Sequence, residues 1–487
     1  MTRPAWLRVL RLLAGVISST FLLEFLWIAA SRAGYPYDLE FQEGGVVEHA
    51  RRILAGQPLY PPPSIDFVPY IYPPLYFWTS AQVMRIAGVG ARAARLVSIV
   101  STLATFALLF HLVHRQTKDR LAGLVTAGLY AACFPVCLCW YDLARVDSLF
   151  LALCLAAAPV IVSPTRSTAA IAGTILGIAF LAKQQALPLA AGLAIALVPA
   201  GTMTAMIFVA AFGAVALGFT LAANAWTHGL YIYYVLEVPA GHALRPWAAS
   251  GFWRHDLGRN VPILVGLAAA LAIVRGGDET RGSRRIALGL LGGGIAASWS
   301  GRLHQGGAEN VLMPAMAALA LAAGLLLGRA RSFTAQGAIL ALLVAQLGMR
   351  LYDPRAQVPT AADRAAGDRL VAELARMDGD VLVADHGFLG VQAGKPAHAH
   401  GMALNDLERS RAVPPGGPLT LDRDLRAAID ARRFSLIVLD GMSRFWKPAL
   451  QGRYEKSGDA FSDPDVFWTR TGVRTRPRLL CRPSPAG

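Results

Sequence analysis

Charged residues are scarce in this sequence: Asp, Glu, Lys and Arg together make up 16% of its 487 residues. Soluble domains carry about a quarter charged residues, whereas 55% of this chain is hydrophobic. Several segments run for about 17–22 residues with almost no charge, which is the length needed to cross the hydrocarbon core of a bilayer. The scarcity of charge excludes a soluble globular protein and predicts a polytopic α-helical membrane protein.

Several motifs of known chemistry are also missing. The chain has no phosphate-binding glycine loop, no HExxH sequence and no recognisable nucleophile motif. The cysteine cluster Cys133–Cys139 has no His or acidic partner at metal-ligand spacing, which favours a packing role. We interpret Asp385–His386 and His398–His400 as incidental loop residues. The sequence therefore predicts no metal site, although a divalent cation remains an open possibility.

The net charge of +15 does not indicate a nucleic-acid-binding protein. Residues 1–350 hold 26 Lys and Arg against 14 Asp and Glu, whereas residues 351–487 hold 20 against 17. Most of the excess therefore lies in loops between apolar segments, where positive charge sets the orientation of a membrane protein.

Apolar runs and basic loops together predict about eleven spans. Arg3, Arg8, Arg11 and the basic loop 114–120 fall on one side in this scheme, which predicts a cytoplasmic N-terminus and an uncleaved first helix. The spans are expected near residues 9–31, 93–113, 121–140, 148–163, 168–182, 185–200, 204–223, 258–274, 286–299, 309–328 and 333–350.

Residues 70–88 are apolar enough to suggest a further span. The segment contains Pro73–Pro74, Thr79 and Gln82, and its Tyr and Trp side chains suit the headgroup level of a membrane. We predict an interfacial helix on the outer surface.

The chain changes character after residue 350. The segments 380–387 and 434–441 are typical of short strands that end in Asp, and a helical pattern precedes each one. Alternating helix and strand predicts a small extracytoplasmic α/β domain over residues 351–487, after a membrane domain over residues 1–350. The tail, residues 474–487, is rich in Pro and Arg and is expected to be disordered.

Three acidic residues lie close together after the first predicted span. Asp38 and Glu40 precede a helix that is predicted to begin at Glu43. Acids at a helix start stabilise its dipole, which is the structural interpretation. Neighbouring acids that face a polar cavity can also raise one another's pKa and supply a general base, or ligate a metal. We favour the catalytic interpretation.

Polar residues gather in the other loops that are predicted on the outer side. Asp147, in "YDLARVD", can cap the next helix or line a cavity. Lys183 stands alone between two apolar runs, where it can reach the interface or hold a phosphate as a point charge. Polar groups crowded at the edge of a span are usually functional, and the short loop before residue 311 contains Arg302, His304, Glu309 and Asn310.

The order of these motifs resembles the GT-C superfamily. The chain has "EGGVVEHARRILAGQPLY" and "YPPLYFW" at the first outer loop, "ARVD" before a span and "FLAKQ" after one. GT-C proteins are membrane glycosyltransferases that use polyprenyl-phosphate sugars, and they include bacterial aminoarabinose transferase and the protein O-mannosyltransferases. The similarity covers roughly residues 1–350. The family's first loop usually carries an adjacent Asp-Glu pair, whereas Gln42 precedes Glu43 here.

The resemblance implies that a sugar passes from a polyprenyl-phosphate donor to an acceptor hydroxyl at the outer face of a bacterial inner membrane. The acceptor is a lipid, a glycan or a protein. Glu43 or Glu40 is the expected base, assisted by Asp38 and Asp147, and direct displacement would invert the anomeric centre. The resemblance implies that Lys183 meets the donor phosphate, and cations that hold the growing charge are needed there. The further candidates are Arg145 and Arg302 for that phosphate, and Tyr72, Pro73, Pro74, Tyr76, His304, Glu309 and Asn310 for the cavity.

A lipid-linked sugar flippase or secondary transporter is the main alternative, because transporters also bury acids and cations. Such a protein would carry polar residues near the centres of its spans, whereas this chain has them at the outer ends. A catalytically silent scaffold and a ligase that uses a diphosphate-linked glycan are further alternatives. The expected partners are the donor lipid, the acceptor and membrane lipids, and not nucleic acid.

Overall fold

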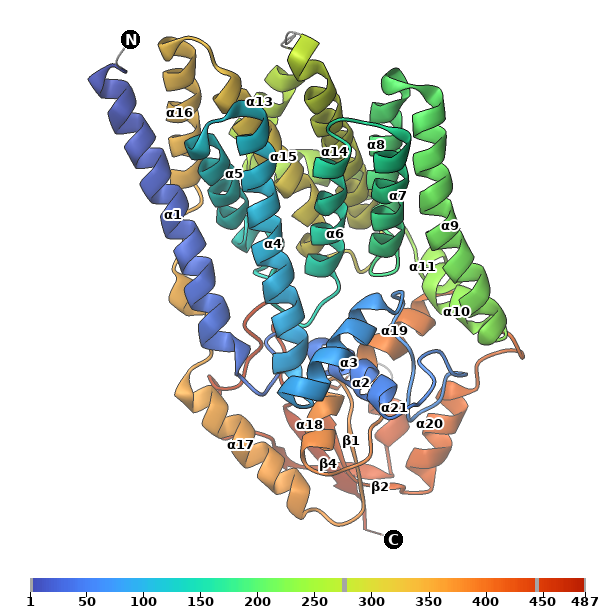
Figure 1. Ribbon diagram of the computed structural model, residues 1–487. Helices are drawn as coiled ribbons and strands as arrows, with labels where there is room; N and C mark the ends of the chain where they lie inside the picture. The colour runs from blue at the N-terminus through green and yellow to red at the C-terminus, as the bar shows by residue number, and fades with distance from the viewer. Residues whose placement is uncertain (1–2, 274–277, 443–445, 486–487) are drawn as a thin grey trace.

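The computed structural model describes residues 3–273, 278–442 and 446–485. Long helices form a bundle at one end of the molecule, and a small sheet with its own helices lies at the other end (Figure 1). The N-terminus lies at the end of the bundle that is far from the sheet. The bundle contains α1 (Ala5–Ala33), α4 (Ala91–Thr117), α5 (Arg120–Ala132), α6 (Asp147–Val160), α7 (Arg166–Phe180), α8 (Ala186–Leu197), α9 (Thr202–Trp226), α13 (Pro262–Ile273), α14 (Asp278–Leu303), α15 (Met313–Arg329) and α16 (Phe333–Gly348).

Each predicted span overlaps one of these helices, and residue 274, the last of the span predicted over 258–274, lies outside the described residues. Among the described residues, five helices are long and apolar enough to cross a membrane, or six if the segments Pro246–Arg259 and Pro262–Ile273, bent by 100°, form one span. Five further apolar helices have 10–17 residues, fewer than the roughly 20 that a perpendicular crossing needs. The chain is an integral membrane protein, and the total of eleven spans stays a prediction.

Specific contacts fix the bundle at the end far from the sheet. Asp119 caps α5, because its side chain accepts hydrogen bonds from the backbone amides of Leu121 and Ala122. The same carboxylate forms a two-bond ion pair with Arg11 of α1, at 3.0 and 3.1 Å. Deeper in the bundle, Gly192 of α8 and Gly289 of α14 face each other so closely that a Cβ on either one would overlap the backbone of the other. Small residues therefore set the close approach of α8 and α14.

Two short helices, α2 (Glu43–Leu54) and α3 (Leu75–Ala87), lie between the bundle and the sheet (Figure 1). Helix α3 has 13 residues and is therefore about 20 Å long, too short to cross a hydrocarbon core of about 30 Å. This length agrees with the interfacial helix predicted for residues 70–88. The remaining helical turns are α10 (Leu230–Ile232), α11 (Val238–Ala240), α12 (Pro246–Gly251), η1 (Pro135–Cys137), η2 (Val198–Ala200), η3 (Tyr233–Glu237), η4 (Phe252–Arg259), η5 (Glu309–Leu312) and η6 (Pro354–Gln357).

The C-terminal region, residues 351–485, contains a four-stranded sheet in the order β1-β2-β4-β3. The two predicted strands are confirmed as β1 (Asp380–Val383) and β2 (Phe434–Leu439), which pair in parallel. β3 (Tyr454–Asp459) and β4 (Leu479–Pro483) join them by antiparallel pairing. The domain boundary at residue 350 stays a prediction. The helices of this region are α17 (Ala361–Arg376), α18 (Gly387–Gln392), α19 (Gly401–Arg409), α20 (Leu421–Asp430) and α21 (Trp446–Leu450).

The prediction that residues 474–487 are disordered is wrong for the described residues. Strand β4 lies inside the sheet, between β2 and β3. The side chain of Cys481 is 1% exposed and belongs to the apolar core beneath the sheet. The Pro- and Arg-rich composition concealed the short apolar run Leu479–Cys481, which is long enough for one strand of a small sheet.

Candidate active site

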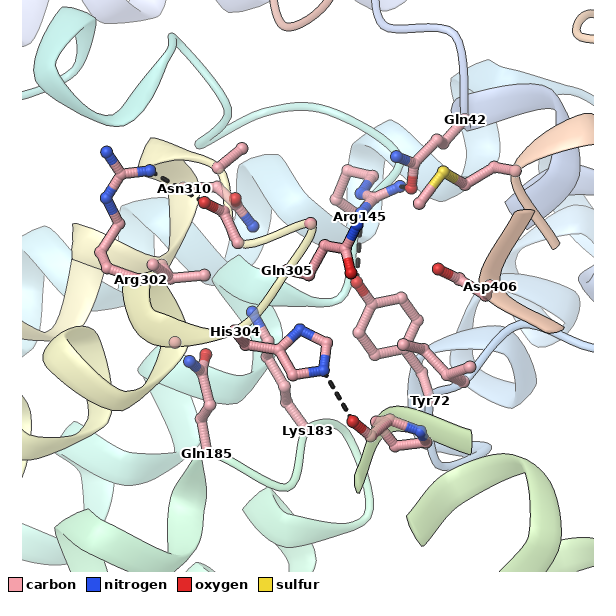
Figure 2. Close-up of a pocket in the computed structure, with 18 of the residues that line it drawn as sticks. Gln42, Tyr72, Arg145, Lys183, Gln185, Arg302, His304, Gln305, Asn310 and Asp406 are labelled. Carbon is pink, nitrogen blue, oxygen red and sulfur yellow. Dashed lines mark hydrogen bonds between the residues drawn. The ribbon is translucent and has the colours of Figure 1, made fainter. Parts of the chain in front are cut away.

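A cavity of about 770 Å³ lies between the sheet end of the bundle and the C-terminal region. Its wall comes from the first loop (residues 34–42), from the loop 138–146 before α6, and from the break between α7 and α8. Residues 300–311 and helix α19 complete much of it. Figure 2 shows Arg145, Lys183, His304 and Asp406 around this space. Segments that are distant in the sequence therefore converge on one chamber.

The cavity collects about half of the predicted site residues. Those that line it are Glu40, Tyr72, Arg145, Lys183, Arg302, His304, Glu309 and Asn310. The others lie outside the lining: Asp38, Glu43, Pro73, Pro74, Tyr76 and Asp147. Tyr76 is fully buried against α4, where its hydroxyl donates to the carbonyl of Ala94 at 2.7 Å. The Pro-Pro segment thus turns the chain into α3 and does not itself face the cavity.

Glu40 is the carboxyl group of the first loop that reaches the cavity wall. Its side chain is buried, and its Oε2 atom accepts a hydrogen bond from the amide of Gln42 at 3.2 Å and lies 3.6 Å from Arg145 Nη1. Its Oε1 atom has no hydrogen-bond partner within the described residues. Burial raises the pKa of Glu40 to about 8, although Arg145 opposes the shift. A carboxyl group with a pKa near neutrality is suited to proton transfer.

Glu43 is bound on every side. Its two oxygens accept hydrogen bonds from the Arg95 guanidinium at 2.6 and 2.9 Å, from the amide of Leu39 at 2.7 Å and from that of Ala144 at 2.8 Å. Burial by itself would raise the pKa of Glu43, but Arg95 and these amides outweigh it and hold the pKa below its usual value. Glu43 therefore ties the first loop to α4 and to the loop before α6.

Asp38 faces the C-terminal region. Its carboxylate lies 2.8 Å from Nδ1 of His386, whose Nε2 lies 3.1 Å from Asp440. Burial raises the pKa of Asp38, and His386 opposes that shift. The pKa of His386 is raised well above its usual value, because the carboxylates of Asp440 and Asp38 outweigh the effect of burial. A charged His between two carboxylates therefore joins the first loop to Asp440, the residue that follows strand β2.

Asp147 lies one layer behind the cavity wall, where it binds Lys183 and Asn310, which both line the cavity. Lys183 lies in the break between α7 and α8, and its Nζ atom is 2.5 Å from Oδ1 of Asp147. Asn310 donates to the same oxygen at 2.9 Å. Asp147 is the first residue of α6 and makes no side-chain capping bond, so the capping role considered for it is wrong. The carboxylate instead positions Lys183 at the cavity surface.

The other predicted cations are also held by partners. Arg145 donates to the amide oxygen of Gln42 and to the Tyr72 hydroxyl, the latter at 3.3 Å (Figure 2). Arg302 pairs with Asp256 at 2.7 Å and with Glu309 at 3.1 Å. These contacts fix the orientation of both guanidinium groups.

His304 lines the cavity as a neutral hydrogen-bonding group. One of its ring nitrogens lies 2.8 Å from the carbonyl oxygen of Pro239. Burial lowers the pKa of His304, and Arg245 and Arg409 add to this shift. A lowered pKa keeps the imidazole uncharged at neutral pH, so His304 adds hydrogen-bonding groups but no charge to the cavity wall.

Sequence reasoning missed several residues of the site. Arg245 and Arg409 line the cavity and form no ion pair with a carboxylate of the described residues. Asp406 also lines it, and burial raises its pKa to about 7. Of the described lining residues, five are Lys or Arg and three are Asp or Glu. Because two of those acids have raised pKa values, the wall is positive and suits a phosphate.

Two buried arginines that position the loops were also missed, although the sequence held a signal for them. Arg95 lies within a predicted span and Arg32 at the edge of another, where charge is rare and usually functional. Arg32 pairs with Asp142, with its Nε atom 2.6 Å from Oδ2. Within the described ranges, no group of three or more His, Cys, Asp or Glu side chains is arranged to hold a metal ion.

Comparisons with known proteins found a matching family model and similar solved structures. The model of the family described as dolichyl-phosphate-mannose-protein mannosyltransferase matches residues 72–228. The structure is similar to that of ArnT from Cupriavidus metallidurans bound to undecaprenyl phosphate, with a TM-score of 0.60 and 13% identity over 95% of this chain and 97% of that one. No curated protein matches the sequence.

Two further solved structures are less similar. The apo form of the same ArnT has a TM-score of 0.46 and 14% identity, over 95% of this chain and 97% of that one. An oligosaccharyltransferase of Archaeoglobus fulgidus, tethered to an acceptor peptide, has a TM-score of 0.47 and 11% identity, over 99% of this chain and 76% of that one. The family match and the fold shared with the ligand-bound ArnT confirm the resemblance to the GT-C superfamily of membrane glycosyltransferases.

Proposed function

We propose that this protein transfers a monosaccharide from a polyprenyl-phosphate donor to an acceptor hydroxyl at the outer face of a bacterial inner membrane. The observation that carries the proposal is the placement of Glu40 in the same cavity wall as Arg145 and Lys183. A base and two cations within one chamber are the groups that such a transfer requires. The sheet end of the bundle is then the extracytoplasmic end, with the N-terminus in the cytoplasm.

The donor phosphate binds at the positive part of the wall. When the bond between the anomeric carbon and the phosphate oxygen breaks, its electron pair stays on the polyprenyl phosphate and adds negative charge there. Lys183 is oriented by Asp147 and Arg302 by Asp256, so that both cations are in place before this charge develops. Arg245 and Arg409 line the same cavity without a carboxylate partner, and they supply further positive charge for the phosphate.

Glu40 is the base in this mechanism. It accepts the proton of the acceptor hydroxyl while the hydroxyl oxygen forms its bond to the anomeric carbon on the face opposite the phosphate, which inverts that centre. The unpaired Oε1 atom is the available proton acceptor. Glu43 has no such free position, because Arg95 and two backbone amides occupy its oxygens. Of the two bases that the sequence left open, we choose Glu40.

The proposal is tested with purified protein in liposomes and a panel of radiolabelled polyprenyl-phosphate monosaccharides. Release of polyprenyl phosphate by the wild type, lost in Glu40→Gln and reduced in Lys183→Ala, is the expected result. Movement of label across the bilayer without turnover would instead indicate a flippase or transporter. The family match and the structural neighbours give no support to that alternative.

A further inference from the structure

The C-terminal region reaches the first loop through a tight turn, residues 469–475. Within the turn, the Thr469 amide donates to the carbonyl of Thr475 at 3.1 Å, and the Thr469 hydroxyl donates to the carbonyl of Val473 at 2.7 Å. Gly472, near its tip, has a φ of +71°, a left-handed conformation that favours glycine. The turn is thus closed on itself by hydrogen bonds.

Both ends of the turn are held by hydrogen bonds to other segments, and one end binds Leu39, the residue before Glu40, directly. On one side, the carbonyl of Leu39 accepts hydrogen bonds from the amides of Arg470 at 2.8 Å and Thr471 at 3.2 Å. The Thr471 hydroxyl donates to the carbonyl of Leu138, in the loop before α6. On the other side, the Thr475 hydroxyl donates to Asp440.

Asp440 continues this connection to the first loop, because it contacts His386, which contacts Asp38. The turn is therefore linked to Asp38 and to Leu39, the two residues that precede Glu40.

The tip of the turn lies directly on the Glu40 side chain. A Cβ built on Gly472 would be 2.9 Å from Glu40 Cγ, 3.6 Å from Glu40 Oε1 and 3.3 Å from the ring of Trp140. The closest of these distances is shorter than real Cβ contacts, so only a glycine fits there without displacement. Gly472 and Trp140 both line the cavity together with Glu40, whose Oε1 atom has no hydrogen-bond partner within the described residues.

We infer that the 469–475 turn is a positioning element for Glu40: it keeps the carboxyl group out of water and fixes it at the cavity wall. The role of the turn in sugar transfer rests on the proposed function, whereas its effect on the carboxyl group does not. The charged and titratable groups that face Glu40 from the surrounding elements are Arg145, Glu43, Asp38, Tyr70 and Tyr72. The two arginines of the turn are engaged elsewhere, Arg470 with Asp363 and Arg474 over Trp468.

The effect of the turn on pH dependence follows from burial. With the turn in place, desolvation holds the pKa of Glu40 at about 8, so the active carboxylate decreases about tenfold for each pH unit below that value. If the turn is loosened, water solvates the carboxylate and its pKa falls toward the ordinary value of about 4.3. The acidic limb of the kcat/KM profile then moves to lower pH. A variant that is merely less stable loses activity by a similar factor at every pH.

The experiment compares Thr471→Ala, which removes the hydrogen bond to Leu138, with Thr471→Ser, which can retain it. Gly472→Ala is compared with Gly416→Ala, because Gly416 also has a positive φ, of +100°, but no atom within 4 Å of its Cβ position. Infrared titration of the carboxyl band, as the difference between each protein and its Glu40→Gln derivative, reports the protonation of Glu40 without any substrate.

We expect the midpoint of this titration, and the acidic limb of kcat/KM, to fall by at least one pH unit in Thr471→Ala and Gly472→Ala, and to stay near the wild-type values in Thr471→Ser and Gly416→Ala. Unchanged midpoints in Thr471→Ala and Gly472→Ala, or a wild-type carboxyl that titrates as an ordinary glutamate, would overturn the inference. A shifted midpoint together with full transfer in Glu40→Gln would support the turn but refute Glu40 as the base.

Discussion

Glu40 and Glu43, which both follow α1, have opposite electrostatic environments. Glu43 has an arginine and two backbone amides on its oxygens, and its pKa is lowered. Glu40, three residues earlier, is equally buried but has one unpaired oxygen and a raised pKa. Burial is therefore not what separates the two carboxyl groups. The partners that the fold brings to each one decide that Glu43 is a structural anion and Glu40 a candidate proton acceptor.

The sharpest test of this comparison is Glu40→Gln. Loss of a general base typically lowers the rate by about 10²–10⁴-fold, and we expect a decrease of that order in kcat/KM for sugar transfer. The thermal midpoint at neutral pH should not fall, because a carboxyl group with a pKa of about 8 is already largely uncharged there and the amide has a similar size and polarity. A fall in the thermal midpoint that is large enough to explain the lost activity by unfolding would contradict the distinction between Glu40 and Glu43.

Glu43→Gln should instead affect mainly the stability of the protein. The substitution leaves the Arg95 guanidinium buried without its carboxylate, and breaking a buried ion pair costs about 3–5 kcal/mol. We expect a marked decrease in the thermal midpoint. As a control, the double variant Glu43→Gln with Arg95→Gln should be less destabilised than the sum of the two single variants, because the two side chains are in contact.

Lys183→Ala addresses the donor side of the cavity. A hydrogen bond to a charged group contributes about 1.5–3 kcal/mol, so we expect kcat/KM for the donor to fall by about 10- to 100-fold. Lys456 is half exposed and pairs with Asp459 at 2.7 Å in strand β3, away from the cavity, which makes Lys456→Ala the matched control. Equal activity of the two variants would remove Lys183 from the phosphate site.

The smallest expected effect is that of Arg409→Ala. Arg409 is exposed and has no carboxylate partner among the described residues, so its loss leaves no buried charge behind. We expect the KM for the donor to rise a few-fold, by about 1 kcal/mol or less, in line with a solvent-accessible charge contact. Addition of salt should reduce the difference from the wild type. Arg423→Ala, at an exposed position of α20, should have no effect.

The sequence was informative where the membrane imposes strong rules. Long apolar runs predicted the bundle, since a chain in hydrocarbon must satisfy its backbone within helices. The scarcity of charge in those runs made Lys183 and Arg302 conspicuous, and both line the cavity. A resemblance carried by the order of short motifs was confirmed by the family match and by the fold.

The hydrogen-bond and ion-pair partners of each polar residue could not be predicted from the sequence, because they come from distant segments. Nothing near Glu43 in the chain indicates that Arg95 binds it, or that the amide of Ala144 does. His386 was interpreted as incidental, yet it joins Asp38 to Asp440 across more than three hundred residues. Strand β4 was missed since its three apolar residues are typical of a strand only when two partners flank it.

The central position of β4 also has a consequence for biosynthesis. The strand pairs with β2 and β3, both of which precede it in the chain, and the 469–475 turn comes just before it. The 469–475 turn, which contacts Glu40, is therefore synthesised only after every helix of the bundle. A nascent or truncated chain that ends before residue 479 lacks the strand that anchors this turn. The turn that contacts Glu40 can therefore be anchored only after synthesis has passed β4, when the helices of the bundle have already been made.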